Sequence, residues 1–204
     1  MHKTVLTEVI ILRKIPYSET SLIINSLSPE YGRLDFIIKG ARRISKKSFP
    51  EIDIFRKLKI EFKEIAMSKN LISPLSFDLI EDNDRIAGYP EAISRIYKII
   101  SFILKNIHAG VSCRFVYDAF DNMLCKTSEG KEYPFFLIKL IYLYENGLLP
   151  NELSVSDKDN KNKKILNLLI NSAIGKIDTL KLPDEYVQSL NKWVNNLCLA
   201  NDLE

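Results

Sequence analysis

The chain has few of the residues on which metal and nucleotide chemistry depend. Its 204 residues include only 3 cysteines, 2 histidines and 7 glycines. The cysteines (Cys113, Cys125, Cys198) are widely spaced and odd in number, which suits neither a disulfide framework nor a four-ligand zinc site. Neither of the glycine-rich loops that cradle phosphates, G-x-G-x-x-G and G-x-x-x-x-G-K-[ST], occurs. We therefore expect no bound metal and no cofactor.

Long apolar segments are missing as well. No run approaches the roughly 18 apolar residues that indicate a membrane-spanning helix. At the N-terminus, Glu8 comes before any apolar stretch of signal-peptide length. We expect a cytoplasmic protein with reduced thiols and no membrane association.

Catalytic pairs are equally scarce. His2 lies at the terminus, so a nucleophile and base would have to be Cys113 and His108. Residues five apart do not share a helix face, which disfavours that pair. A surface histidine beside a buried thiol is the simpler interpretation. We expect no catalytic residue and a protein that is not an enzyme.

Charge is present but unevenly distributed. Hydrophobic residues make up 46% and charged residues 27% of the chain, as in an ordinary globular protein, and the net charge is +3. Residues 1–70 hold 14 Lys/Arg against 8 Asp/Glu, whereas the remaining 134 residues hold 15 against 18. Such asymmetry indicates a part that binds a polyanion joined to a part with another task.

The first seventy residues have the pattern of short strands separated by turns. Apolar and β-branched runs occur at 5–12, 22–27, 34–38, 49–55 and 58–66. Five such strands in a small basic domain are typical of a closed or partly closed barrel. We place this domain at residues 1–72.

The remainder has helical periodicity. Apolar residues recur at helical spacing in 90–107, 112–125, 135–144, 164–173 and 184–199. The segment 135–144 is apolar on all sides except at Lys139, which predicts a central helix. Residues 154–164 are polar without periodicity and predict a loop. The plan is an α+β chain, with a helical domain at 78–204 and a connection near 68–80.

One segment has an unusually high density of positive charge, the basic segment 39–47 (KGARRISKK). Five of its nine residues are basic and none is acidic. Loops between barrel strands bind nucleic acid through cations that contact phosphates and aromatic rings that stack on bases. Phosphate binding is favoured over a merely solubilising charge run. Other nearby residues could extend the site: the cations Arg33, Lys14 and Lys3, and the aromatics Tyr17, Tyr31, Phe36 and Phe49. For each of these aromatics, packing in the core or at its rim is the favoured interpretation over stacking on a base.

Three segments of this region resemble the N-terminal domain of the bacterial recombination mediator RecO family. They are residues 11–24 (ILRKIPYSETSLII), 28–34 (SPEYGRL) and 39–43 (KGARR), in the order and spacing of that family. Residues 140–150 (LIYLYENGLLP) are similar to the family's helix and the turn that follows it. In this comparison Glu19 and Gly40 match the motif but suit structural roles, a turn acid and a sharp bend.

The resemblance implies a five-stranded OB-fold barrel followed by an α-helical domain. It implies binding to single- and double-stranded DNA and annealing of complementary strands in DNA repair and recombination. The implied partners are RecR, the C-terminal tail of single-stranded-DNA-binding protein and, indirectly, the recombinase RecA, in a bacterial, nucleoid-associated setting. The DNA-contacting residues would be Lys39, Arg42, Arg43, Lys46 and Lys47, with Arg33 as a weaker member.

The chain departs from the family in one respect. Many members carry a four-cysteine zinc element after the turn, where this chain has the polar segment 154–164. The resemblance therefore carries over no metal, and any partner surface built on that element is in doubt. Two rival functions stay open: a protein–protein adaptor of the repair or replication machinery with weak or no DNA binding, and an RNA-binding OB module.

Overall fold

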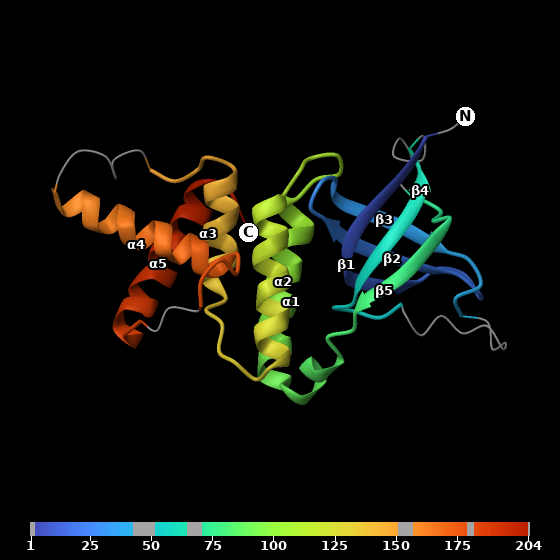
Figure 1. The fold of residues 1–204 in the computed structure, drawn as a ribbon, viewed down its shortest axis with the longest axis horizontal. Helices are drawn as coiled ribbons and strands as arrows, with labels where there is room; N and C mark the ends of the chain where they lie inside the picture. The colour runs from blue at the N-terminus through green and yellow to red at the C-terminus, as the bar shows by residue number, and fades with distance from the viewer. Residues whose placement is uncertain (1–2, 43–51, 65–70, 151–156, 179–181, 204) are drawn as a thin grey trace. The chain divides into compact units, whose positions relative to one another are not determined.

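The computed structural model describes residues 3–42, 52–64, 71–150, 157–178 and 182–203. The elements run from strands to helices (Figure 1). The strands are β1 (Thr4–Pro16), β2 (Leu22–Ser28), β3 (Gly32–Ile38), β4 (Lys57–Lys63) and β5 (Ser76–Glu81). A 3-10 helix, η2 (Asp84–Gly88), precedes the helices α1 (Pro90–Asn106), α2 (Arg114–Ser128), α3 (Phe136–Glu145), α4 (Asp157–Ala173) and α5 (Asp184–Ala200).

The strands form one antiparallel sheet in the order β3-β2-β1-β4-β5. The long strand β1 pairs with β4 along its first half and with β2 along its second half, and Ile10 pairs with both. A register shift between Ile11 and Arg13 interrupts the pairing with β2. An irregularity of this kind bends the strand. The predicted strands at 5–12, 22–27 and 34–38 are thus confirmed, with β1 extending to Pro16. The predicted strand at 58–66 is confirmed as far as Lys63, where β4 ends, and residues 65–66 lie outside the described part.

The sheet is not closed into a barrel. Its outer strands, β3 and β5, form no ladder with each other in the described residues. Instead Ile72 makes a single parallel bridge to Phe36, with hydrogen bonds from Ile37 N to Ile72 O and from Ile72 N to Asp35 O, each 2.9 Å. An α+β chain with a five-stranded OB-type sheet is therefore confirmed, in its partly open form.

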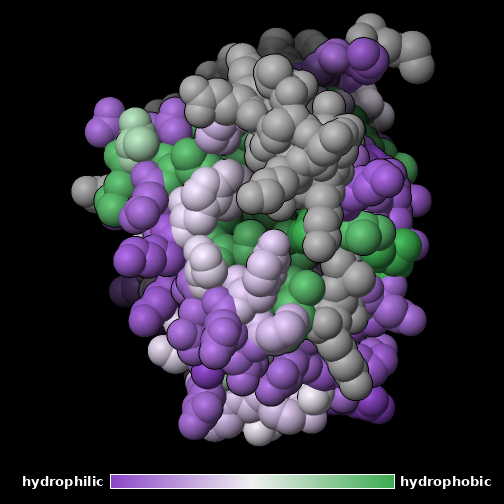
Figure 2. All heavy atoms as spheres, turned by 90° about the vertical axis from the view of Figure 1, so that its left-hand side faces the viewer, coloured by the Kyte–Doolittle hydropathy of each residue, from purple (hydrophilic) through white to green (hydrophobic). Residues whose placement is uncertain are grey.

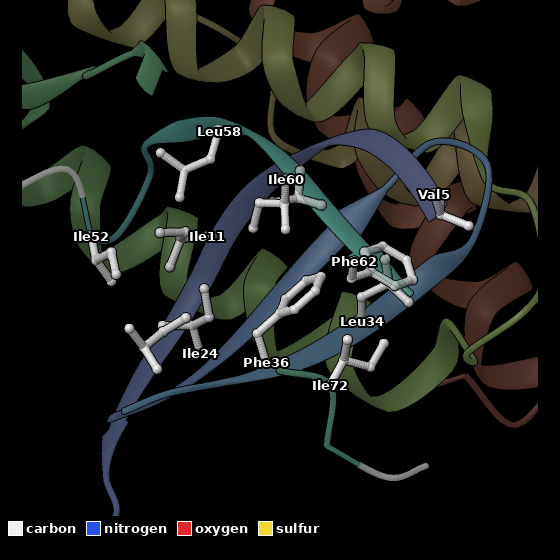
Figure 3. Packing of buried hydrophobic residues seen from close by; sticks show 12 residues of the cluster. Val5, Ile11, Ile24, Leu34, Phe36, Ile52, Leu58, Ile60, Phe62 and Ile72 are labelled. Atoms are coloured by element: carbon white, nitrogen blue, oxygen red, sulfur yellow. The ribbon is translucent and has the colours of Figure 1, made fainter. Parts of the chain in front are cut away.

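Alternate residues of the strands fill the concave side of this sheet. The core cluster contains Val5, Val9, Ile11, Ile24, Leu34, Phe36, Ile38, Ile52, Leu58, Ile60, Phe62 and Ile72. Most of these side chains converge in Figure 3, where the Phe36 and Phe62 rings lie edge to face with centroids 5.6 Å apart. Period-two burial explains why the hydrophobic pattern located most of the strands.

The predicted strand at 49–55 is wrong in its described part. Residues 54–55 form a turn, and Phe55 has a φ of 68°, which is incompatible with extended backbone. Ile52 and Phe55 are each 6% exposed. They are apolar because the segment 52–55, although it is not a strand, buries both side chains in the interior. The fifth strand is β5, which begins in the expected connection at 68–80 and extends one residue past it. Its sequence is largely exposed and includes two acidic residues, so it carries little strand signal.

The chain divides into two compact units, and each is described by itself. The β unit comprises residues 1–85 together with 107–114, and the helical unit comprises 86–106 together with 115–204. The connection between α1 and α2 thus belongs to the β unit. The chain passes between the units three times, after Arg85, Asn106 and Arg114.

Within the helical unit α3 is the central element. Seven of its ten residues are buried, and it packs against both α4 and α5. The Tyr133 hydroxyl donates to Ala173 O at 3.2 Å and lies 3.4 Å from Ala119 O, which ties α2 to α4. The central position predicted for 135–144 is confirmed.

Helix α4 corrects the prediction of a loop at 154–164. The helix begins at Asp157, and residues 154–156 lie outside the described part. Its later residues Leu169, Ile170 and Ala173 are buried and anchor it. A helix anchored at one end can continue through polar residues, which removes the periodicity on which the prediction depended. In the portion of the chain that the structure describes, no helix has both the length and the hydropathy needed to cross a membrane.

Candidate nucleic-acid interface

The turn after β3 holds the described part of the basic segment. It bends at Gly40, where φ is 76°, a conformation that glycine adopts without strain. Lys39 and Arg42 on either side of this bend are exposed. Arg43, Lys46 and Lys47, the other predicted contacts in this segment, lie outside the described residues.

The turn at 39–42 is held against the β1–β2 loop, residues 17–21. Arg42 N donates to Thr20 O at 3.1 Å, and its guanidinium Nη1 donates to Ser18 O at 2.7 Å. Within the loop, Tyr17 N donates to Ser21 O at 3.0 Å, and Ser18 has a φ of 81°. These contacts place Arg42 and use one of the several N–H donors of its guanidinium.

Tyr17 is the exposed aromatic residue of this loop, with 51% of its surface accessible. The other aromatic candidates differ from it. Phe36 is fully buried in the core, and the Tyr31 ring packs edge to face on Phe62 at 6.5 Å. Phe49 lies outside the described residues. Tyr17, Lys39 and Arg42 therefore form one exposed group, the cationic site, on two neighbouring turns.

Arg33 lies away from the cationic site. It is at the start of β3, about 20 Å from the turn at the other end, given about 3.3 Å per residue. Its Nε lies 3.6 Å from the carboxylate of Asp35, which in turn accepts a hydrogen bond from Asn25 at 2.8 Å. The structure therefore does not bring Arg33 together with Lys39 and Arg42.

The other two cations considered from sequence have carboxylate partners. Lys14 pairs with Asp53 at 2.7 Å, and Lys3 pairs with Glu64 at 3.0 Å. Burial by itself would raise the pKa of the Asp53 carboxyl. The hydrogen bond from Lys14, the Ile54 N–H and the charges of Lys14 and Arg56 outweigh that effect and hold the pKa below its ordinary value.

Sequence reasoning overlooked Arg13. This residue is exposed on β1 opposite Asn25, on the sheet face away from the core. The sequence feature that could have identified Arg13 as outward-facing is the alternation of β1, but the register shift between Ile11 and Arg13 interrupts that alternation. Because a bulge reverses which residues face outward, strict period-two counting assigns the end of β1 to the wrong face.

The turn of the second quoted motif, residues 28–32, has a structural task that the sequence did not reveal. The segment 107–114 runs along it, with Gly110 N donating to Tyr31 O at 2.8 Å and Cys113 N to Pro29 O at 3.1 Å. Glu30 accepts from Arg114 at 3.0 Å and from Thr7 at 2.7 Å. This motif therefore attaches the α1–α2 connection to the β unit.

Metal-ligating side chains do not gather in the part of the chain that is described. No group of three or more His, Cys, Asp or Glu there could hold an ion. The buried thiol of Cys113 contacts Ser28 O at 3.3 Å, and Cys198 is also buried.

Residues 1–77 match the family model of the N-terminal part of recombination protein O. The match contains the whole of β1 to β4, the turn at 28–32 and the cationic site, and it ends inside β5. A comparison with curated proteins found no match to the chain. The N-terminal domain of the chain is therefore that of the RecO family of DNA recombination and repair proteins.

Proposed function

We propose that the chain binds DNA through the cationic site and anneals complementary strands as a recombination mediator. The observation that carries this proposal is the juxtaposition of Lys39, Arg42 and Tyr17 on two turns, which are joined by one backbone and one side-chain hydrogen bond from Arg42. Cations at fixed positions contact phosphates without reading sequence, and an exposed ring stacks on an unpaired base. Arg43, Lys46 and Lys47 follow directly in the chain and would add to the same field.

The proposed mechanism is electrostatic rather than catalytic. Two DNA strands repel each other through their phosphates, and cations held between them lower that repulsion enough for bases to pair. Such a protein needs no nucleotide and no general base. In the cell it would help the recombinase RecA to replace single-stranded-DNA-binding protein, in concert with RecR, as the family resemblance implies.

The deciding experiment is a titration of the intact chain with single- and double-stranded DNA at several salt concentrations. Three to five phosphate contacts predict a slope of log affinity against log salt of about −2 to −3.5 on single strands. The double variant Arg42→Glu/Arg43→Glu should weaken binding to every DNA tested and slow annealing in step. Lys98→Glu/Lys105→Glu on the exposed face of α1 is the charge-matched control.

A second function, a protein–protein adaptor, draws support from the helical unit. The apolar side chains of α1 and α3 are largely buried, so they bury one another rather than line an open groove. Helix α5, by contrast, buries only Val194 and Cys198 and exposes Tyr186 and Leu199. Figure 2 shows hydrophobic residues (green) exposed at the surface between hydrophilic ones (purple).

An acidic tail peptide of single-stranded-DNA-binding protein is the partner that this apolar surface would accept. Calorimetry with that peptide tests the adaptor function separately from DNA binding. Heat release that Leu199→Ser abolishes would support it, and absence of heat would remove it. If the Arg42→Glu/Arg43→Glu variant folds and still binds DNA like the parent, the adaptor becomes the better account.

A further inference from the structure

Three isoleucines lie side by side across the sheet, one on each of β1, β2 and β3. Ile15 is directly opposite Ile23, and Ile23 is directly opposite Ile37. We call these three residues the isoleucine row. Their neighbours Ile24, Phe36 and Ile38 belong to the core cluster. Because successive side chains of a strand point to opposite faces, Ile23 and Ile37 lie on the face away from the core.

The isoleucine row is partly exposed, and it adjoins the cationic site. Ile15 precedes Tyr17 by two residues, Ile23 follows the β1–β2 loop, and Ile37 precedes Lys39 by two residues. On the side away from that site the next row is polar, with Arg13 opposite Asn25 and Asn25 opposite Asp35. The apolar surface is thus confined to the end of the sheet that carries Lys39 and Arg42.

An apolar strip beside a cationic one matches the chemistry of a single strand of nucleic acid. A single strand presents phosphates along one side and unstacked base faces along the other. A duplex keeps its bases stacked inside and offers mainly phosphates to a protein surface that does not enter its grooves. In OB-folds the face of the second and third strands, with the loop before them, is where oligonucleotides bind.

We propose that the isoleucine row contacts the bases of a single DNA strand whose phosphates are held by Lys39 and Arg42. The row thereby gives the chain a preference for single-stranded over double-stranded DNA. This inference rests on the proposed function, because it adds base contacts to a site where only phosphate contacts were assigned.

The test replaces two members of the row in the intact chain, as Ile23→Thr/Ile37→Thr. Threonine keeps the β-branched shape that suits a strand while removing apolar surface. The control is Leu6→Thr, because Leu6 is 59% exposed on the same strand as Ile15 but about 30 Å away along it. The probes are a fluorescent oligothymidylate, an abasic strand of equal length and a duplex of equal length.

The double variant should bind the oligothymidylate about tenfold more weakly, the factor expected for losing two partial aliphatic contacts. Its affinity for the abasic strand and for the duplex should change by less than about twofold, since phosphate contacts persist. The slope of log affinity against log salt should stay that of the parent. Leu6→Thr should leave binding to all three probes unchanged.

Two outcomes would overturn the inference. An equal loss on all three probes would mean that the substitutions disturb the cationic site rather than base contacts. No loss on the oligothymidylate, while Arg42→Glu does weaken it, would mean that the row only packs the sheet and that the proposed function stands without it. If the double variant unfolds, each single threonine variant is measured with the same probes and should lose about threefold. Failure of Arg42→Glu to weaken any probe would contradict the proposed function itself.

Discussion

Gly32 packs closely against the carbonyl oxygen of His108. A Cβ built on Gly32 would overlap that oxygen and crowd Val111 O, and Gly32 has a φ of 64°. Its neighbour Arg33 donates its N–H to the same carbonyl at 3.4 Å. The glycine of the 28–32 turn therefore allows two segments of backbone, far apart in sequence, to meet without a side chain between them.

Replacing Gly32 by alanine should destabilise the chain by about 2–4 kcal/mol, because positive φ and backbone overlap both oppose it. Gly110→Ala is a matched control, since Gly110 has a φ of 80° but no atom within 4 Å of its added Cβ. It should cost only about 1 kcal/mol, the strain of the backbone alone. Urea unfolding of both variants measures the difference, and equal losses would mean that the close approach is unimportant.

Glu145 at the end of α3 accepts hydrogen bonds from Phe115 N and Val116 N, both at 3.0 Å, at the start of α2. Burial of the carboxyl raises its pKa above the ordinary value, and the two N–H groups offset this only in part. A raised folded pKa means that the folded state holds the proton more tightly than the unfolded state. Stability then falls as pH rises from the ordinary glutamate range to the folded pKa, and it stays level above that.

Glu145→Gln should remove this dependence while keeping one acceptor oxygen. The stability of the variant relative to the parent should therefore increase as pH rises through that window. Urea unfolding of both proteins across the acid range measures the relative stability. A parent that gains on the variant with rising pH would show that the hydrogen bonds lower the pKa instead.

Tyr17→Ala should weaken binding to single-stranded DNA by about tenfold, because stacking of an aromatic ring on a base contributes about 1–3 kcal/mol. Tyr17→Phe should bind like the parent, since the ring is retained. Tyr186→Ala on α5, a tyrosine with a similar exposed fraction of 43%, serves as the control. Fluorescence anisotropy measures the affinities, and parental binding by Tyr17→Ala would exclude a stacking role.

The purified chain should contain no stoichiometric zinc, and a chelator should not shift its unfolding. The physical reason is the supply of ligands, since zinc sites use close pairs of thiols and imidazoles and this chain has 3 cysteines and 2 histidines, widely spaced. Elemental analysis is the measurement. About one zinc per chain would show that ligands converge in a way the described residues do not show.

The sequence by itself determined most of the local structure of this protein. Alternation in β3 and β4 reflects one buried face, and the helical periodicity of α1, α2 and α5 reflects buried stripes, so both could be predicted from residue order. The glycine at position 40 and the basic residues around it located the cationic site, because a bend followed by unbalanced charge is unsuited to a core.

Tertiary structure alone decided where that pattern is misleading. Ile52 and Phe55 are apolar without being in a strand, because the irregular segment 52–55 buries both side chains. Strand β5 has little apolar signal because it lies largely exposed at the sheet edge. The pairing register aligned Ile15, Ile23 and Ile37, and the folded chain separated Arg33 from Arg42 and attached 107–114 to Glu30. Contacts between residues so distant in sequence depend on packing in three dimensions, and the periodicity of a short sequence segment carries no information about them.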